Sequence, residues 1–377
     1  TANTVSGAFE QALDRAWLQV SSGAFDYKTA VKRAVDGLAD SMPYVTYPSG
    51  YRDTLEVACR RAVLTGVNQT GAKLQEARMD EMGASFVEVT AHGGARPSHA
   101  VWQGRHYHRG GAVDYLGQHY EDFESATGYG TGAGLCGWNC RHTFFVVFPE
   151  LGSPPAWTQE SLEALNARDI EYNGQKCTRY EISQMQRARE RAVCKWKRRY
   201  LAEDAAGADT TASAMKLRQA RQSLADFTRA TGGRVDSART SVHGFGRSEG
   251  SKASYAARKQ ERFNAANTEL QQMREAGTIK AKGRLIESPS APNEINFASD
   301  HVLQRWAERG MGPMDAERII RSSKVAMSQR NGTQTCYYSE LGFVAIGQDG
   351  NVSSIGPLDE GGKKLMEVVK KHGIPHS

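Results

Sequence analysis

The alternation of hydrophobic and polar positions predicts helices in the first part of the chain and two strands after them. Apolar residues recur at helical spacing from Val5 to about Leu38, where SGAFDY divides them into two helices, and again from about Asp53 to Met82. The segment SFVEVTAH, residues 85–92, alternates in a way typical of a strand, and HTFFVVFPE, residues 142–150, predicts a second strand. If these strands pair, the ends of the intervening loop lie together.

Polar helices and a turn signal characterise the middle of the chain. The helices are predicted over residues 158–166, 181–205 and 210–231. Thr158 is the expected N-cap of the first of them. An Asn-Gly pair within residues 170–181 predicts a hairpin between two short strands.

The last part of the chain changes in composition. Residues 233–295 are rich in Ser, Ala, Gly and Arg and predict a linker with one helical stretch at 251–276. From residue 296, two helices split by GMGP precede four short strands joined by Asn-Gly, Leu-Gly and Asp-Gly turns, and a final helix follows at about 359–372. This pattern predicts an antiparallel meander.

The predicted fold class is therefore multidomain α+β: a mainly helical N-terminal region with a small β hairpin and loop knot, then a C-terminal domain of two helices, a four-stranded antiparallel sheet and a terminal helix. The expected domains are a helical region at 1–84, a His- and Cys-rich loop and hairpin at 85–180, a basic helical pair at 181–232, the linker at 233–295 and the α+β domain at 296–377.

Composition narrows the class of protein. A chain of 377 residues exceeds one typical domain, and its 6 Trp, 14 Tyr and 12 Phe exclude a disordered chain. No run approaches the roughly 20 apolar residues of a membrane span, and no signal peptide pattern is present, so we expect a soluble protein that is not exported. Six scattered cysteines favour a reducing compartment. Because residue 1 is Thr, we expect an initiator Met before it.

The net charge of +6 is unevenly distributed. The segment RARERAVCKWKRRY, residues 187–200, carries seven basic residues against Glu190. The candidate anion-binding residues are Arg187, Arg191, Lys195, Lys197, Arg198 and Arg199. Such a block suits DNA, and binding would then weaken steeply with salt. A solvated helix face is the more common origin of a basic helix of this kind.

Histidine and cysteine gather between the two predicted strands. Four of the ten histidines lie in HGGARPSHAVWQGRHYH, residues 92–108, and GLCGWNCRH follows before the second strand. The candidate metal ligands are His92, His99, Cys136, Cys140 and His142. Four convergent imidazole and thiolate ligands could hold a structural Zn²⁺.

Three other interpretations of this cluster stay open. The histidines could form a polar turn network without metal, or Cys136 and Cys140 could form a disulfide. Alternatively, Cys140 and His99 could serve as nucleophile and base of a hydrolase.

Long motifs on both sides of this cluster resemble a known family. YPSGYRDTLEVACRRAVLTGVNQT, EMGASFVEVTAHGGARPSHAVWQGRHYH, GYGTGAGLCGWNCRHTFFVVFPE and YNGQKCTRYEISQMQRARERAVCKWKRR are similar to the phage minor capsid protein 2 family, which is related to the head-morphogenesis group named after the Mu F protein. The similarity runs from about residue 10 to 230.

The resemblance implies a virion component present in few copies, acting near the portal with other capsid and portal proteins, and found in the host cytoplasm during assembly. The family's marked positions here are Arg96, Pro97, His99, Trp102, Gly104, Cys136, Trp138, Asn139, Cys140, Arg141 and His142. We expect buried indoles, a Pro-fixed backbone and an Arg bonded to carbonyls to make the loop rigid.

The C-terminal segment more loosely resembles small nuclease toxins of the barnase, EndoU, colicin and RelE type, in element order and in DHVLQRWAERG. Metal-independent RNA cleavage needs a base for the 2′-hydroxyl, a cation for the phosphorane and an acid for the leaving oxygen. His301 and Arg305 could supply the base and the cation from one helix face. The candidate catalytic residues are His301, Arg305, Arg309, Lys324, Tyr337 and Ser353, with Arg330 as a further completion. Alternatively, the arginines pair with Glu308, Asp315 or Glu317 at the surface.

A nuclease of this kind would make the chain a polymorphic toxin delivered with the virion, with RNA as substrate and an immunity protein as partner. From residue 296 the chain carries ten Lys and Arg against nine Asp and Glu, which is weakly basic for an RNA-binding domain.

Overall fold

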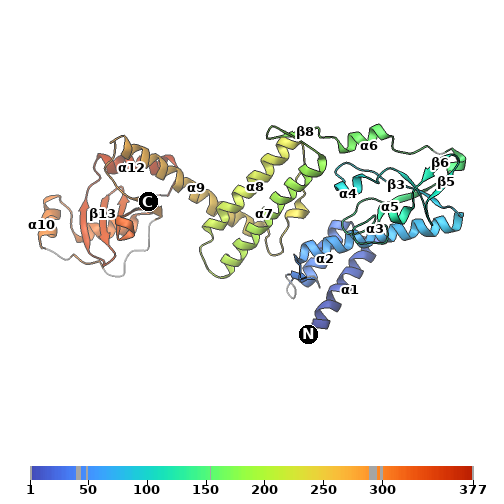
Figure 1. Cartoon of the computed structure of the whole chain (residues 1–377). Helices are drawn as coiled ribbons and strands as arrows, with labels where there is room; N and C mark the ends of the chain where they lie inside the picture. Colours follow the sequence, from blue (N-terminus) through green and yellow to red (C-terminus); the bar gives the residue numbers. More distant parts are fainter. Residues whose placement is uncertain are drawn as a thin grey trace. The chain divides into compact units, whose positions relative to one another are not determined.

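The computed structural model describes residues 2–39, 44–47, 50–152, 154–287, 295–297 and 300–375, with the backbone alone at 2–6, 300–302 and 305. The chain divides into two units (Figure 1). One comprises residues 1–206 and 216–249, and the other comprises residues 207–215 and 250–377.

Three helices pack together at the start of the N-terminal unit. They are α1 (Ala2–Ser21), α2 (Tyr27–Leu38) and α3 (Leu55–Met82). The apolar positions that predicted these helices form their shared core, which includes Ala16, Val35 and Cys59. Asp26 caps α2 by accepting hydrogen bonds from the backbone N–H groups of the first turn.

A three-stranded sheet follows, and it confirms the predicted pairing. β3 (Phe86–Val89) lies between β4 (His106–His108) and β7 (Phe144–Val147), and both pairings are antiparallel. Phe86 pairs with Val147, and Val89 pairs with Phe144. The C-terminal half of α3 packs on this sheet (Figure 1). The sheet thus brings the two ends of the His- and Cys-rich loop together.

Short elements complete this part of the unit. They are β1 (Tyr44–Thr46), β2 (Arg52–Thr54), α4 (Pro97–Ala100), β5 (Val113–Tyr115), β6 (Gln118–Tyr120), α5 (Phe123–Thr127), η1 (Pro149–Leu151), α6 (Gln159–Asn166), β8 (Ile170–Tyr172) and β9 (Gln175–Cys177). Thr158 caps α6 as predicted. The Asn173-Gly174 turn between β8 and β9 has positive φ at both residues, as a type I′ hairpin requires.

Two long helices extend from this region, as predicted. They are α7 (Arg179–Ala205) and α8 (Thr211–Thr231). A capping box between Thr178 and Glu181 begins α7. The short helix η2 (Ser237–Thr240) packs beside α7, since Lys197 donates to the carbonyl of Thr240. Among the described residues, no helix has the length and apolar character to cross a bilayer.

The C-terminal unit is built on a five-stranded antiparallel sheet. Its strands, in spatial order, are β10 (Arg284–Glu287), β11 (Val325–Gln329), β12 (Gln334–Ser339), β13 (Gly342–Gly347) and β14 (Val352–Gly356). The predicted α+β class is confirmed. The four predicted strands are present, and β10 adds a fifth at one edge.

Helices cover both faces of this sheet. The helices are α9 (Arg247–Glu275), α10 (Asp300–Glu308), α11 (Pro313–Ser322) and α12 (Glu360–Lys371), and η3 (Arg330–Gly332) joins two strands. Alternate residues of β11 belong to different cores: Val325 and Met327 pack in the cluster that contains residues of α9 and α12, and Ala326 packs in the cluster of α10 and α11. The unit therefore has three layers.

The segment predicted as a linker, 233–295, contains two elements of this unit. Phe263, Ala266 and Leu270 of α9 are buried against the sheet, and Leu285 of β10 is buried with them. The predicted helical stretch at 251–276 is confirmed, but it is a covering layer and not a tether. The buried stripe of α9 is narrow and rich in Ala, so its composition resembles that of a solvated linker helix.

Asn267 of α9 bonds directly to the edge strand. Its side-chain amide donates to the carbonyl of Leu285 at 2.9 Å and accepts from the Leu285 N–H at 2.7 Å. The side chain thus satisfies backbone groups that an edge strand leaves unpaired.

Replacing Asn267 with Ala is expected to lower the free energy of unfolding of the C-terminal unit by about 1–3 kcal/mol, because both groups of Leu285 lose their partner. Urea unfolding followed by circular dichroism measures the change. Asn264→Ala, at an exposed position of the same helix, is the control and should change stability by less than about 0.5 kcal/mol. Equal effects of the two substitutions would contradict this role.

Candidate functional site

Three predicted metal ligands meet in the core of the N-terminal unit. His99 lies on α4, and Cys140 and His142 lie in the segment that leads into β7. Sγ of Cys140 is 3.7 Å from Nδ1 of His99 and 3.6 Å from Nδ1 of His142. All three residues are buried. We call these residues the His–Cys cluster.

Hydrogen bonds on the far side of each imidazole hold the cluster. Nε2 of His99 lies 2.9 Å from the carbonyl oxygen of Ala133, and Nε2 of His142 lies 2.9 Å from Oε1 of Gln103. Gln103 is fully buried, and its Oε1 also accepts from the backbone N–H of His92 at 3.1 Å. Gln103 was not among the predicted site residues. The one signal for it in the sequence is its position four residues, or about one helical turn, after His99.

The other two predicted ligands lie beside the cluster. The ring of His92 stacks on that of His142 with 4.3 Å between centroids, and its Nε2 is buried without a hydrogen-bond partner in the described part of the chain. Cys136 instead donates from Sγ to the carbonyl of His142 at 3.5 Å. All six cysteines are free thiols, which contradicts the disulfide alternative.

The environment of Cys140 does not suit nucleophilic catalysis. Its side chain is buried, and burial raises the pKa of the thiol. Burial also lowers the pKa of His142, to about 3, and lowers the pKa of His99, so both imidazoles are neutral at pH 7. A reactive cysteine instead needs a low pKa and access to solvent. The hydrolase interpretation with Cys140 and His99 finds no support in this geometry.

The loop around the cluster has the expected rigid features, with one correction. Arg96 donates from Nη2 to the carbonyl of Trp138 at 2.6 Å, as predicted for an Arg bonded to carbonyls. Trp102 is buried, but Trp138 is 64% exposed, so the prediction of buried indoles holds only for the first. A Cβ on Gly134 would lie 1.9 Å from the carbonyl oxygen of Gly128, and this close approach of two backbones requires glycine.

Glu88 is a second buried polar centre that sequence reasoning missed. It lies on β3 with 1% of its surface exposed, and its Oε2 is 2.7 Å from Nε2 of His106 on β4. Both carboxylate oxygens accept from the N–H of Ala156, at 3.1 and 3.0 Å. Glu88 therefore connects β3 both to β4 and to the segment that follows the sheet.

The basic block of α7 is largely used within the unit. Arg198 pairs with Glu56 at 3.1 Å, and Arg199 pairs with Glu203 one turn along the helix. Lys197 is half-buried where α7 contacts η2, and burial lowers the pKa of its ammonium group. Arg187 is half-buried, whereas Arg191 and Lys195 are exposed. The six candidates therefore do not form one basic face.

The predicted catalytic residues whose side chains the structure describes are spread over the sheet of the C-terminal unit. Arg309 donates to the carbonyl of Ile355 at 2.9 Å, next to β14. Tyr337 is 2% exposed in the core under α11. Ser353 Oγ donates to the carbonyl of Ala345 at 3.1 Å. Lys324 precedes β11, three strands from β14 in the sheet order. The described members are thus not brought together.

The remaining candidate residues of the C-terminal unit lie in η3, α10 and α11. Arg330 is exposed in η3. The side chains of His301 and Arg305 lie outside the described residues, although the backbone of both belongs to α10. Arg321 rather than Arg309 pairs with Glu317, at 3.6 Å.

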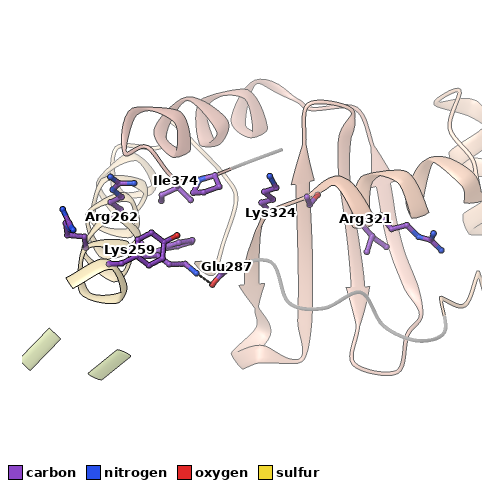
Figure 2. Close-up of a pocket in the computed structure, with 12 residues that line it drawn as sticks. Lys259, Arg262, Glu287, Arg321, Lys324 and Ile374 are labelled. Carbon is purple, nitrogen blue, oxygen red and sulfur yellow. Dashed lines mark ion pairs between the residues drawn. The ribbon is translucent and has the colours of Figure 1, made fainter. Parts of the chain in front are cut away.

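Lys324 belongs to a basic pocket of about 670 Å³. Its charged lining residues are Arg258, Lys259, Arg262, Arg321, Lys324 and Glu287. Figure 2 shows Lys259 of α9 directed toward Glu287, with which it forms an ion pair, and Arg321 directed away from the other labelled side chains. The exposed ring of Tyr255 also lines the pocket.

Comparison with known proteins identifies the N-terminal part of the chain. The family model for phage minor capsid protein 2 matches residues 1–229, which contain the sheet, the His–Cys cluster and nearly all of α8. No curated protein and no solved structure matches the chain. The match extends over more than half of the 377 residues and agrees with the motifs found in the sequence. The chain belongs to the phage minor capsid protein 2 family.

Proposed function

We propose that this protein is a structural component of the virion, present in few copies, that acts near the portal during head assembly with other capsid and portal proteins. The family match over residues 1–229 carries this proposal. The geometry supports a structural role, because the polar groups at the centre of the N-terminal unit are buried and bonded to one another.

The test is deletion of the gene in the encoding phage, with assembly followed by electron microscopy of the lysate. Loss of normal heads, restored by the full chain supplied from a plasmid, is the expected result. Normal heads of full infectivity in the deletion strain would overturn the assembly role.

A specific observation favours a second function, the binding of single-stranded nucleic acid by the C-terminal unit. Residues 250–377 carry 18 Lys and Arg against 14 Asp and Glu, so most of the positive excess comes from the segment before residue 296. Five cations and one carboxylate line the pocket, and Tyr255 offers an exposed ring. Basic side chains with an aromatic ring are the usual elements of such a site. The exposed aromatic ring beside the basic side chains favours the pocket over α7, where Lys197 and Arg198 bond to other parts of the N-terminal unit.

Fluorescence anisotropy of the full chain with a labelled single-stranded RNA, and with DNA of the same sequence, tests the pocket. Arg258→Ala/Arg262→Ala should weaken binding at least tenfold and reduce the slope of log K against log salt by about 1.4, or 0.7 per phosphate contact. The charge-matched control Arg318→Ala/Lys363→Ala, at two exposed positions outside the pocket, should do neither. Equal losses of affinity in the two variants would show that the pocket is not the binding site.

The same RNA tests the nuclease proposal, in which His301 and Arg305 cleave it without a metal. That proposal predicts shortened RNA fragments that disappear in His301→Ala, and toxicity that an immunity protein relieves. Intact RNA after incubation with the parent chain would contradict it.

A further inference from the structure

The ligand atoms of the His–Cys cluster are spaced like those of a tetrahedral metal site. Sγ of Cys140 lies 3.7 and 3.6 Å from the two Nδ1 atoms, and all three atoms lie within 4.8 Å of one another. A tetrahedral ion with a Zn–S bond of about 2.3 Å and Zn–N bonds of about 2.0–2.1 Å separates sulfur and nitrogen by about 3.6 Å.

Hydrogen bonds fix which ring nitrogens carry protons. The carbonyl of Ala133 can only accept, so Nε2 of His99 is its donor. The backbone N–H of His92 donates to Oε1 of Gln103, which establishes that this atom is the oxygen, so Nε2 of His142 is also a donor. In their neutral forms, both imidazoles therefore present the lone pair of Nδ1 to Cys140.

Two lone pairs thus converge on one thiol. A thiol has a single proton, so it can satisfy at most one of the two Nδ1 atoms, and the other faces the sulfur lone pairs. Buried polar atoms without partners are costly, and this cluster is closed to solvent. A cation bound by a thiolate and two neutral imidazoles satisfies all three atoms.

We propose that His99, Cys140 and His142 bind one Zn²⁺ ion, and that the ring of His92 turns from its stack on His142 to supply the fourth ligand. Nitrogen and sulfur ligands in a closed site are those that zinc prefers. The bonds from each imidazole to Ala133 and Gln103 are the outer partners that metal-bound histidines usually have. His92 is adjacent, and its buried Nε2 has no hydrogen-bond partner among the described residues.

The ion would connect α4 to the segment before β7, 41 residues further along the chain. This loop has little regular structure between β4 and β7, so its order depends on such cross-links. The proposal goes beyond the capsid role, which stands whether or not a metal binds.

The test equilibrates the purified full chain with Zn²⁺, removes unbound metal by gel filtration, and measures zinc by mass spectrometry. About one zinc per chain is expected. Replacement by Co²⁺ should give the intense visible absorption of a tetrahedral site with a sulfur-to-cobalt band. A parent chain that retains no zinc, or binds cobalt without the sulfur band, overturns the proposal.

Variants locate the ligands. Cys140→Ser should reduce bound zinc at least tenfold and abolish the sulfur-to-cobalt band, whereas Cys136→Ser, a buried thiol bonded to the same stretch of chain, should keep both. Equal loss of zinc in the two variants contradicts the assignment. If His92→Ala leaves the zinc affinity unchanged, His92 is not a ligand.

A second set of measurements separates metal loss from unfolding. Gln103→Leu should weaken zinc binding about 10- to 100-fold and shift the cobalt spectrum, because Gln103 orients His142 without contacting the ion. Removal of the metal from the parent chain with a chelator should lower the melting temperature, and added zinc should restore it. A melting temperature that neither the chelator nor added zinc changes would contradict a structural role for the ion.

Discussion

A C-terminal fragment that begins at residue 285 is expected to be unfolded, whereas a fragment that begins at residue 246 is expected to fold. The shorter fragment lacks α9, which covers one face of the sheet with Phe263, Ala266 and Leu270. Burial of each large apolar side chain contributes about 1.5–3 kcal/mol, and a domain has only about 5–15 kcal/mol in total. The shorter fragment also leaves the edge of β10 without Asn267.

Circular dichroism and thermal melting of the two purified fragments measure this difference. Fragment 246–377 should melt cooperatively, and fragment 285–377 should show no transition. The double substitution Phe263→Ala/Leu270→Ala in the longer fragment should reproduce part of the loss. Cooperative melting of fragment 285–377 at the same temperature would show that α9 is only a tether.

Replacing Glu88 with Ala is expected to destabilise the N-terminal unit by about 2–5 kcal/mol, because each buried donor that is left without its acceptor costs about 1–3 kcal/mol. The substitution leaves Nε2 of His106 and the N–H of Ala156 without their acceptor inside the protein. Because Glu88 lies on the central strand, the loss affects both neighbouring strands.

Urea unfolding of the full chain, followed by tryptophan fluorescence, measures the effect of Glu88→Ala. The control is Glu121→Ala, at an exposed position near the same sheet, which should change stability by less than about 0.5 kcal/mol. A change below about 1 kcal/mol for Glu88→Ala would show that the buried carboxylate is not a structural anchor.

The elements of the N-terminal unit could be predicted from the sequence because local signals specified them. Alternation and the flanking turns placed β3 and β7, and their pairing followed from the need to close a long loop between them. Thr158 and the Asn173-Gly174 turn act through neighbouring residues alone. Signals of this kind can be recognised in the sequence without knowledge of the tertiary structure.

The sequence predicted that imidazole and thiol groups come together in this loop, but not which of the candidate residues form the His–Cys cluster. Imidazole and thiol groups in one loop indicated five candidate ligands, and three of them meet. Gln103 and the carbonyl of Ala133 decide how the imidazoles are oriented, and neither has a local sequence signature. Cys136 was a reasonable candidate by spacing, but its backbone turns the thiol to a carbonyl.

In the C-terminal unit, the sequence pattern predicted the elements but not which side chains they bring together. Helical spacing groups side chains on one face of α10, but it does not say which strand that face approaches. Arg309 lies next to β14, whereas Lys324 lies beside β10 and α9. The linker prediction rested on composition, which does not distinguish an Ala-rich packed helix from a solvated one.

The most direct test of the central claim measures whether the N-terminal unit enters the virion by itself. A phage that encodes residues 1–246 in place of the full chain is propagated, its particles are purified, and the fragment is quantified against the major capsid protein by mass spectrometry. We expect the fragment at the same copy number as the full chain. Particles that contain the full chain but never the fragment would contradict the assignment of the capsid role to this unit.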